Sequence, residues 1–294
     1  MGAEWLDNGW LSQRSKALLS RHYVMLTFAL KESGKTMQRD VVEIAGSAVE
    51  YFAAGSGRAL LFLHDELGLW PEAPFMKFLC KRRRVVALSL PGFGESDLPL
   101  WMDCVDDLSY VVLGLLDRLG LDVLDIIGCS FGGWVAAELA SKAPERVKRL
   151  VLTAPYGVKL GAADRLEFPD LFAMSKPELA QTSFYNVSLA EINAAELSDA
   201  ELTKVVRNRE SFALFAWEPY LHNPKLSHRL DRATAPTLFI RGTSDGIVSA
   251  EYVATYAALF AHASVAEVPA SGHFVHLEQP EVFVAQSLRF LDLK

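Results

Sequence analysis

Short apolar runs alternate with amphipathic stretches over most of the chain after residue 40. The runs are continuously apolar, which is typical of strands covered on both faces, as in a parallel sheet. The expected strands are 59–63, 85–90, 124–127, 150–152, 238–240 and 265–268. Between them, apolar residues recur at helical spacing. The expected helices are 72–81, 104–119, 131–143, 251–260 and 281–293. This alternation predicts a doubly wound α/β sheet.

Two segments depart from the alternation. The stretches 41–44 and 48–53 flank a Gly-Ser pair, which predicts an antiparallel hairpin before the first of these strands. Between Pro155 and Pro236 no strong strand pattern occurs, and we expect helices there at 176–181, 189–197 and 200–215. The predicted division is an N-terminal helical extension (1–40), a first core part (41–155), a helical insertion (156–232) and a second core part (233–294).

Composition excludes several classes of protein. Of the 294 residues, 51% are hydrophobic and 22% charged, so the chain can bury a large core and is not disordered. The net charge of −7 argues against a nucleic-acid partner, which favours a basic surface. Cys80, Cys104 and Cys129 are widely spaced and form no zinc or disulfide pattern. No apolar run reaches the roughly 18 residues of a membrane span, and the run 24–30 lacks a cleavage site, so we expect a cytoplasmic protein.

The most informative motif is Gly-Cys-Ser-Phe-Gly at 128–132, between an apolar strand and a helical pattern. A sharp strand-to-helix turn holds its serine in a strained conformation, and the two glycines remove side chains that would clash. Ser130 is thereby presented beside a helix N-terminus, where backbone N–H groups face a developing negative charge. This context predicts a nucleophilic serine.

A serine hydroxyl needs a base, and the base needs an orienting acid. Among seven histidines, His273 follows an expected strand and precedes the last helix, whereas His276 is better placed for packing or helix entry. Asp245 follows the strand 237–240, although Asp-Gly is also common turn chemistry. The order Ser130, Asp245, His273 favours a catalytic triad.

With these motifs the sequence resembles the α/β-hydrolase fold family over about 41–294. The segment 89–97 is similar to the family's Pro-Gly-x-Gly-x-Ser loop, and 63–68 stands in place of its His-Gly loop. The resemblance implies an eight-stranded, mostly parallel sheet and a helical lid formed by 156–232. It also implies an oxyanion hole made by the backbone N–H groups of Phe131 and Glu66.

Two departures from the family pattern bear on the chemistry. Asp65 stands where the family usually has glycine, and Glu66 follows, so two carboxylates flank a site that must stabilise an oxyanion. The simpler interpretation of Asp65 is a bond within the loop, and the alternative is a role in the site. The nucleophile is serine rather than aspartate, which disfavours haloalkane dehalogenase and epoxide hydrolase activities.

We therefore expect a serine hydrolase that cleaves an ester, thioester or lactone of a small to medium apolar substrate, with no metal and no organic cofactor. Carbon–carbon hydrolysis of vinylogous diketones is the second hypothesis. Those relatives usually carry asparagine before the serine and tryptophan after the histidine, where this chain has Cys129 and Phe274. A non-catalytic ligand-binding protein is a third, disfavoured because all three triad residues are present.

The expected partner is a small-molecule substrate, without nucleic acid or a membrane span, and homodimer formation is left open. The candidate pocket residues are His64, Asp65, Cys129, Tyr156, Trp217 and Phe274.

Overall fold

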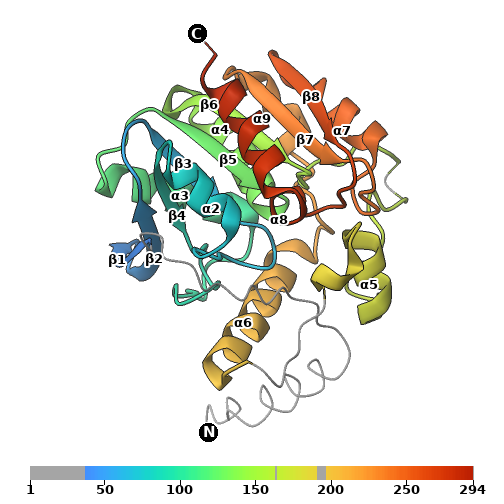
Figure 1. The fold of residues 1–294 in the computed structure, drawn as a ribbon, viewed down its shortest axis with the longest axis horizontal. Coiled ribbons are helices and arrows are strands. Elements are labelled where there is room, and N and C mark those ends of the chain that lie inside the picture. Colours follow the sequence, from blue (N-terminus) through green and yellow to red (C-terminus); the bar gives the residue numbers. More distant parts are fainter. Residues whose placement is uncertain (1–36, 163, 191–196, 294) are drawn as a thin grey trace, which may run out of the picture.

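In the computed structural model, which describes residues 37–162, 164–190 and 197–293, the chain forms an eight-stranded sheet (Figure 1). The strands are β1 (Gln38–Ile44), β2 (Ser47–Ala54), β3 (Ala59–Leu63), β4 (Arg84–Leu88), β5 (Leu124–Cys129), β6 (Val147–Thr153), β7 (Thr237–Gly242) and β8 (Ala263–Val268). Their order across the sheet is β1-β2-β4-β3-β5-β6-β7-β8. The predicted N-terminal helices lie before residue 37, outside the described residues.

The sheet is antiparallel only at its first edge. β1 pairs with β2 around the expected Gly-Ser hairpin, and β2 pairs with β4 in the same antiparallel sense. All later neighbours, from β4–β3 to β7–β8, are parallel. The predicted doubly wound, mostly parallel sheet is therefore confirmed.

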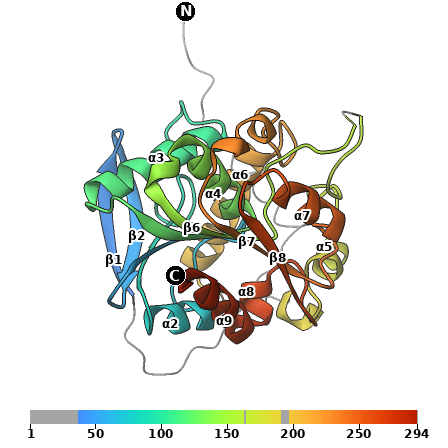
Figure 2. The ribbon, with the colours of Figure 1, turned by 90° about the horizontal axis from the view of Figure 1, so that it is seen from above.

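Helices cover both faces of this sheet (Figure 2). One face is covered by α3 (Val105–Arg118), α4 (Phe131–Lys142) and α7 (Ala250–Ala257). The other is covered by α2 (Pro74–Cys80), α8 (Val275–Glu278) and α9 (Pro280–Leu291). Each of the expected core helices is present, with ends that differ from the expected ones by at most three residues.

Two hydrophobic cores follow from this layering. Successive strand side chains point to opposite faces, so Leu61 and Leu63 of β3 join one core while Leu60 and Phe62 join the other. Because both faces are covered, the central strands contain no polar alternation, which explains the continuous apolar runs in the sequence.

Helices α5 (Lys176–Ser183) and α6 (Asp199–Ala216) follow β6 and lie at one end of the sheet (Figure 1). Ser175 and Ser198 begin them with capping boxes, in which each serine accepts an N–H bond and a glutamate three residues later bonds back. Most of the helix expected at 189–197 lies outside the described residues. Val187–Ala190 is a 3₁₀ turn, and 191–196 lie outside the described residues.

α6 packs on the loops that follow β3 and β4. Asn208 donates to the carbonyl of Leu67 and accepts from the N–H of Gly94, while Ser211 donates to the carbonyl of Gly92. The segment between β6 and β7 is thus attached to the carboxyl ends of the strands. Over the described ranges, no helix is both long and apolar enough to cross a bilayer.

Candidate active site

The strand β5 turns directly into helix α4 at Ser130. The serine has φ of 50° and ψ of −111°, a conformation that L-residues rarely adopt, and its N–H donates to the carbonyl of Thr153. A Cβ at position 132 would overlap the carbonyl oxygens of Leu63 and His64. The glycine expected from the motif is therefore required for the elbow to approach the loop after β3.

The structure brings Ser130, His273 and Asp245 into one chain of hydrogen bonds. Ser130 Oγ lies 2.7 Å from His273 Nε2, and His273 Nδ1 lies 3.0 Å from Asp245 Oδ2. The other oxygen of Asp245 accepts the N–H groups of Ile247 and Val248 at 2.8 and 2.9 Å. With its Nδ1 proton donated to Asp245, the imidazole presents a lone pair at Nε2 to the serine hydroxyl.

The loops that carry Asp245 and His273 are in backbone contact. A Cβ at Gly242 would overlap the carbonyl oxygens of Ser271 and Gly272, and Ser244 N–H donates to the Ser271 carbonyl. The N–H of His273 donates to the carbonyl of Ser183 at the end of α5. The positions of the two loops are thus fixed by main-chain atoms.

Charges around His273 favour its protonated form. Burial of the imidazole lowers its pKa, but the carboxylates of Asp245, Glu66 and Asp65 outweigh burial and raise the pKa of His273 above its ordinary value. The Asp245 carboxylate is the principal cause of the increase.

The predicted oxyanion donors stand on two neighbouring segments. Phe131 is the first residue of α4, and Glu66 belongs to the loop after β3 whose backbone contacts the elbow. In the part of the chain that the structure describes, neither N–H donates to a protein acceptor. Both donors are therefore available to a ligand.

Each oxygen of the Asp65 carboxylate makes a contact that stabilises the loop after β3. Oδ1 accepts the N–H of Leu67 at 2.7 Å, and Oδ2 lies 2.8 Å from His276 Nε2. Burial lowers the pKa of His276, but Cys129 and Asp65 raise it to about 10. A buried contact between His276 and the Asp65 carboxylate therefore connects the loop to α8.

We expect Asp65→Gly to lower kcat by up to about 10²–10³-fold, the effect of losing one oxyanion-hole donor. Without the carboxylate, the Leu67 N–H and His276 lose their partner and the Glu66 N–H is no longer held in place. Steady-state ester hydrolysis together with a thermal melt would separate this loss from unfolding. A kcat above that of the wild type would instead mean that the Asp65 charge opposes the reaction.

The Glu66 side chain lies inside the site, which the sequence did not indicate. Its Oε1 accepts the Tyr156 hydroxyl proton at 2.9 Å and lies 3.7 Å from His273 Nε2. The Tyr156 ring stacks on the His273 ring with 5.4 Å between the ring centroids. The Tyr156 hydroxyl also neighbours the Ser130 side chain. Burial and Glu66 raise the pKa of Tyr156 well above its ordinary value, so the hydroxyl keeps its proton. The only sequence signal was the adjacent pair of acidic residues.

A cavity of about 40 Å³ adjoins this carboxylate. Its lining combines apolar rings with two charged groups. The principal lining residues are Glu66, Leu179, Phe184, Arg209, Phe212 and Phe274. Phe274, a predicted pocket residue, lines this cavity. Arg209 was not anticipated there, because helical periodicity alone does not show which side chains meet another segment.

The other predicted pocket residues lie apart from the cavity. His64 accepts the Leu90 N–H at Nε2 and contacts the Asp65 carbonyl through Nδ1, so it joins two loops. Cys129 is fully buried beside His276. Trp217 follows α6, is 55% exposed and packs on Phe172. The structure does not bring these three side chains to the cavity lining.

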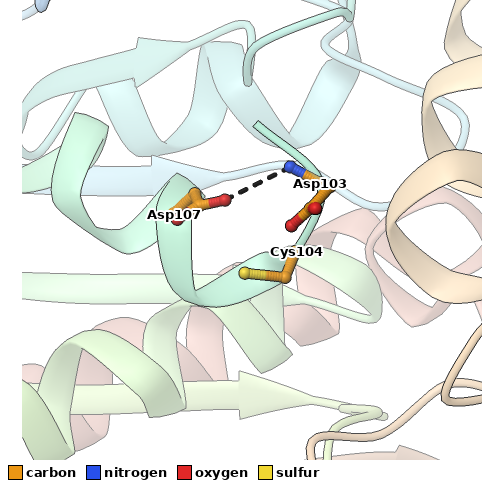
Figure 3. A group of neighbouring side chains, drawn as sticks. All are labelled: Asp103, Cys104 and Asp107. Atoms are coloured by element: carbon orange, nitrogen blue, oxygen red, sulfur yellow. Dashed lines mark hydrogen bonds between the residues drawn. The ribbon is translucent and has the colours of Figure 1, made fainter. Parts of the chain in front are cut away.

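A second group of acidic and thiol side chains lies at the start of α3 (Figure 3). The ligand atoms of Asp103, Cys104 and Asp107 lie within 4.8 Å of one another, and Asp107 accepts the N–H of Asp103. Two of the three residues are exposed. The bond between the aspartates is ordinary helix-start chemistry, and we assign no metal site to this group.

Comparisons with known proteins agree with this architecture. A dihydrolipoyllysine-residue acetyltransferase component of the acetoin cleaving system from Pseudomonas putida is 31% identical over 263 residues, covering 85% of this chain and 68% of that protein. The 2-hydroxymuconate semialdehyde hydrolase of Pseudomonas sp. (strain CF600) is 27% identical over 261 residues, covering 82% of this chain and 89% of that protein. The crystal structure of a membrane phospholipase A has a TM-score of 0.70 with 23% identity, covering 96% of this chain and 89% of the other.

The family described as alpha/beta hydrolase fold matches residues 58–280, a range that contains the elbow, the acid loop and the base loop. The sheet order, the turn at Ser130 and this match agree, and the relatives include enzymes named as hydrolases. The chain therefore belongs to the alpha/beta hydrolase fold family and is a hydrolase.

Proposed function

We propose that this hydrolase cleaves an ester, thioester or lactone of a small to medium, largely apolar substrate through an acyl-enzyme on Ser130. The observation that carries the proposal is the chain of hydrogen bonds from Ser130 through His273 to Asp245. The apolar rings of the adjoining cavity support a substrate with an apolar part.

In the first half of the reaction, Ser130 Oγ attacks the carbonyl carbon while His273 Nε2 takes its proton. The carbonyl oxygen becomes an oxyanion that the N–H groups of Phe131 and Glu66 receive. As the intermediate collapses, the bond from the acyl carbon to the leaving oxygen or sulfur breaks and His273 gives its proton to that atom, which departs as an alcohol or thiol. The acyl group remains on Ser130.

In the second half, His273 removes a proton from water as the water attacks the acyl carbon. Collapse of the second tetrahedral intermediate returns the proton to Ser130 and releases the acid. Asp245 holds the imidazole in the tautomer that both halves require.

We further propose that the segment 156–232 acts as a lid on a core formed by 41–155 and 233–294. Ser130 and His273 are 2% and 1% exposed, and Phe184 and Phe212 of this segment line the cavity that adjoins Glu66. Substrate entry would therefore require the segment to move away from the core.

Carbon–carbon hydrolysis is the second candidate. It is favoured by the Arg209 guanidinium in the cavity lining, which is suited to a substrate carboxylate, and by relatives such as the 2-hydroxymuconate semialdehyde hydrolase. The buried Glu66 carboxylate argues against it, because a like charge would repel an anionic dienoate.

We expect kcat/KM for short-chain or aryl esters to exceed that for a ring-fission dienoate. Chromogenic esters of graded chain length and the loss of the dienoate's visible absorbance measure the two activities on one preparation. Faster turnover of the dienoate would make carbon–carbon hydrolysis the principal activity and overturn the ester assignment.

A further inference from the structure

The Glu66 carboxylate is an unusual group to find beside a nucleophilic serine. Its residue is only 8% exposed, and Oε1 is occupied by the Tyr156 hydroxyl. Within the described ranges, Oε2 is buried and has no hydrogen-bond partner. A buried carboxylate oxygen without a donor is unfavourable, so a ligand that supplies one would be bound preferentially.

The Glu66 carboxylate lies close to the proposed reacting atoms. The carboxylate lines the 40 Å³ cavity, and its other oxygen lies 3.7 Å from His273 Nε2, the atom that also faces Ser130 Oγ. A group that meets Glu66 is therefore only a few bonds from the scissile carbonyl. The small volume admits a primary ammonium group and disfavours a bulky cationic head group.

Arg209 is the other charged group of the cavity lining. Its guanidinium lies over the rings of Phe172 and Phe212 and donates to the Leu171 carbonyl. Glu66, in contrast, is hydrogen-bonded to a residue that stacks on the catalytic imidazole. Glu66 therefore places a carboxylate oxygen 3.7 Å from His273 Nε2.

We propose that Glu66 is a specificity-determining residue that receives a primary ammonium group of the substrate, so that the preferred substrate is an amino-substituted ester. The inference rests on the proposed ester hydrolysis and adds the chemical class of the substrate. The ammonium group would donate to Oε2, while its aliphatic stem packs on rings such as Phe274.

Two matched pairs of esters test the proposal, one with the amino group on the acyl part of the ester and one with it on the alcohol part. Ethyl 3-aminopropanoate is compared with ethyl butanoate, and 3-aminopropyl butanoate with butyl butanoate, by pH-stat titration at neutral pH. We expect the charged ester of at least one pair to have a kcat/KM higher by about tenfold or more, the range of a hydrogen bond to a charged group. Preference for the neutral ester in both pairs would overturn the proposal.

The variant Glu66→Gln removes the charge and keeps an oxygen that can accept from Tyr156. We expect it to bring the ratio of charged to neutral ester to about one, whereas the control Glu72→Gln, on an exposed residue, keeps the wild-type ratio. A preference that persists in Glu66→Gln would show that another group binds the ammonium and would overturn the proposal.

Two further results separate the inference from the proposed function. Preference for monoethyl butanedioate over ethyl butanoate would make Arg209 the group that determines specificity, which overturns the role of Glu66 and leaves ester hydrolysis intact. Absence of turnover for every ester, together with no labelling of Ser130 by a fluorophosphonate, would overturn ester hydrolysis itself and the inference with it.

Discussion

Ser130→Ala is expected to reduce ester turnover by more than about 10⁴-fold while leaving the fold intact. The hydroxyl supplies the attacking oxygen, and no other hydroxyl is hydrogen-bonded to His273 in the part of the chain that the structure describes. Stability should change little, because alanine has the same Cβ in the strained turn and only the contacts of the hydroxyl with His273 and Tyr156 are lost. Chromogenic ester hydrolysis and circular dichroism measure the two effects.

A fluorophosphonate probe provides an independent test of the nucleophile. Intact mass and peptide mapping should place one adduct on Ser130 in the wild type and none in the alanine variant. Ser287→Ala is a suitable control, since Ser287 is a fully buried serine in α9 and should keep activity and labelling. An adduct on another residue, or an active Ser130→Ala enzyme, would contradict the proposed mechanism.

Asp245→Asn should lower kcat by about 10⁴-fold with little change in substrate binding. The N–H groups of Ile247 and Val248 would hold the amide oxygen of asparagine, which turns its NH₂ toward His273 Nδ1. Nδ1 would then have to accept, the proton would move to Nε2, and the imidazole could no longer take the serine proton. Asp117→Asn, on an exposed helix position, is the matched control.

The residual activity of Asp245→Asn should also depend differently on pH. The base acts only when neutral, so wild-type kcat/KM falls as the pH drops through the raised pKa of His273. Removing the Asp245 charge lowers that pKa, so the fall should occur at lower pH in the variant. An unchanged profile, or near-full activity, would point to a different acid.

The sequence predicted the sheet and the core helices because their signals are local. The apolar runs of β3 and β5 reflect burial on both faces, and apolar residues recurring at helical spacing indicated the core helices. The sequence predicted that Ser130, Asp245 and His273 lie close together because each follows a strand, and parallel strands bring their carboxyl ends to one edge.

What the sequence could not indicate are contacts between distant segments. Asp65 bonds to His276, 211 residues away, and Tyr156 bonds to Glu66, 90 residues away, and no local periodicity encodes either pair. The same limit explains Trp217, whose aromatic ring suggested a pocket although the residue lies on an exposed helix end. Glu66 was predicted for its backbone N–H, and its side chain became informative only with the fold in place.

The contact of Gly242 with the carbonyls of Ser271 and Gly272 has a consequence for protein engineering. The separation of the acid and base loops is set by main-chain atoms, so it does not depend on which side chains line the neighbouring cavity. Libraries that randomise Phe184, Phe212 or Phe274 can therefore alter substrate choice without changing the spacing of the reacting groups, provided that Gly242 is left as it is. With such a backbone contact, substitutions that alter substrate specificity can accumulate while the geometry of the reacting groups is preserved.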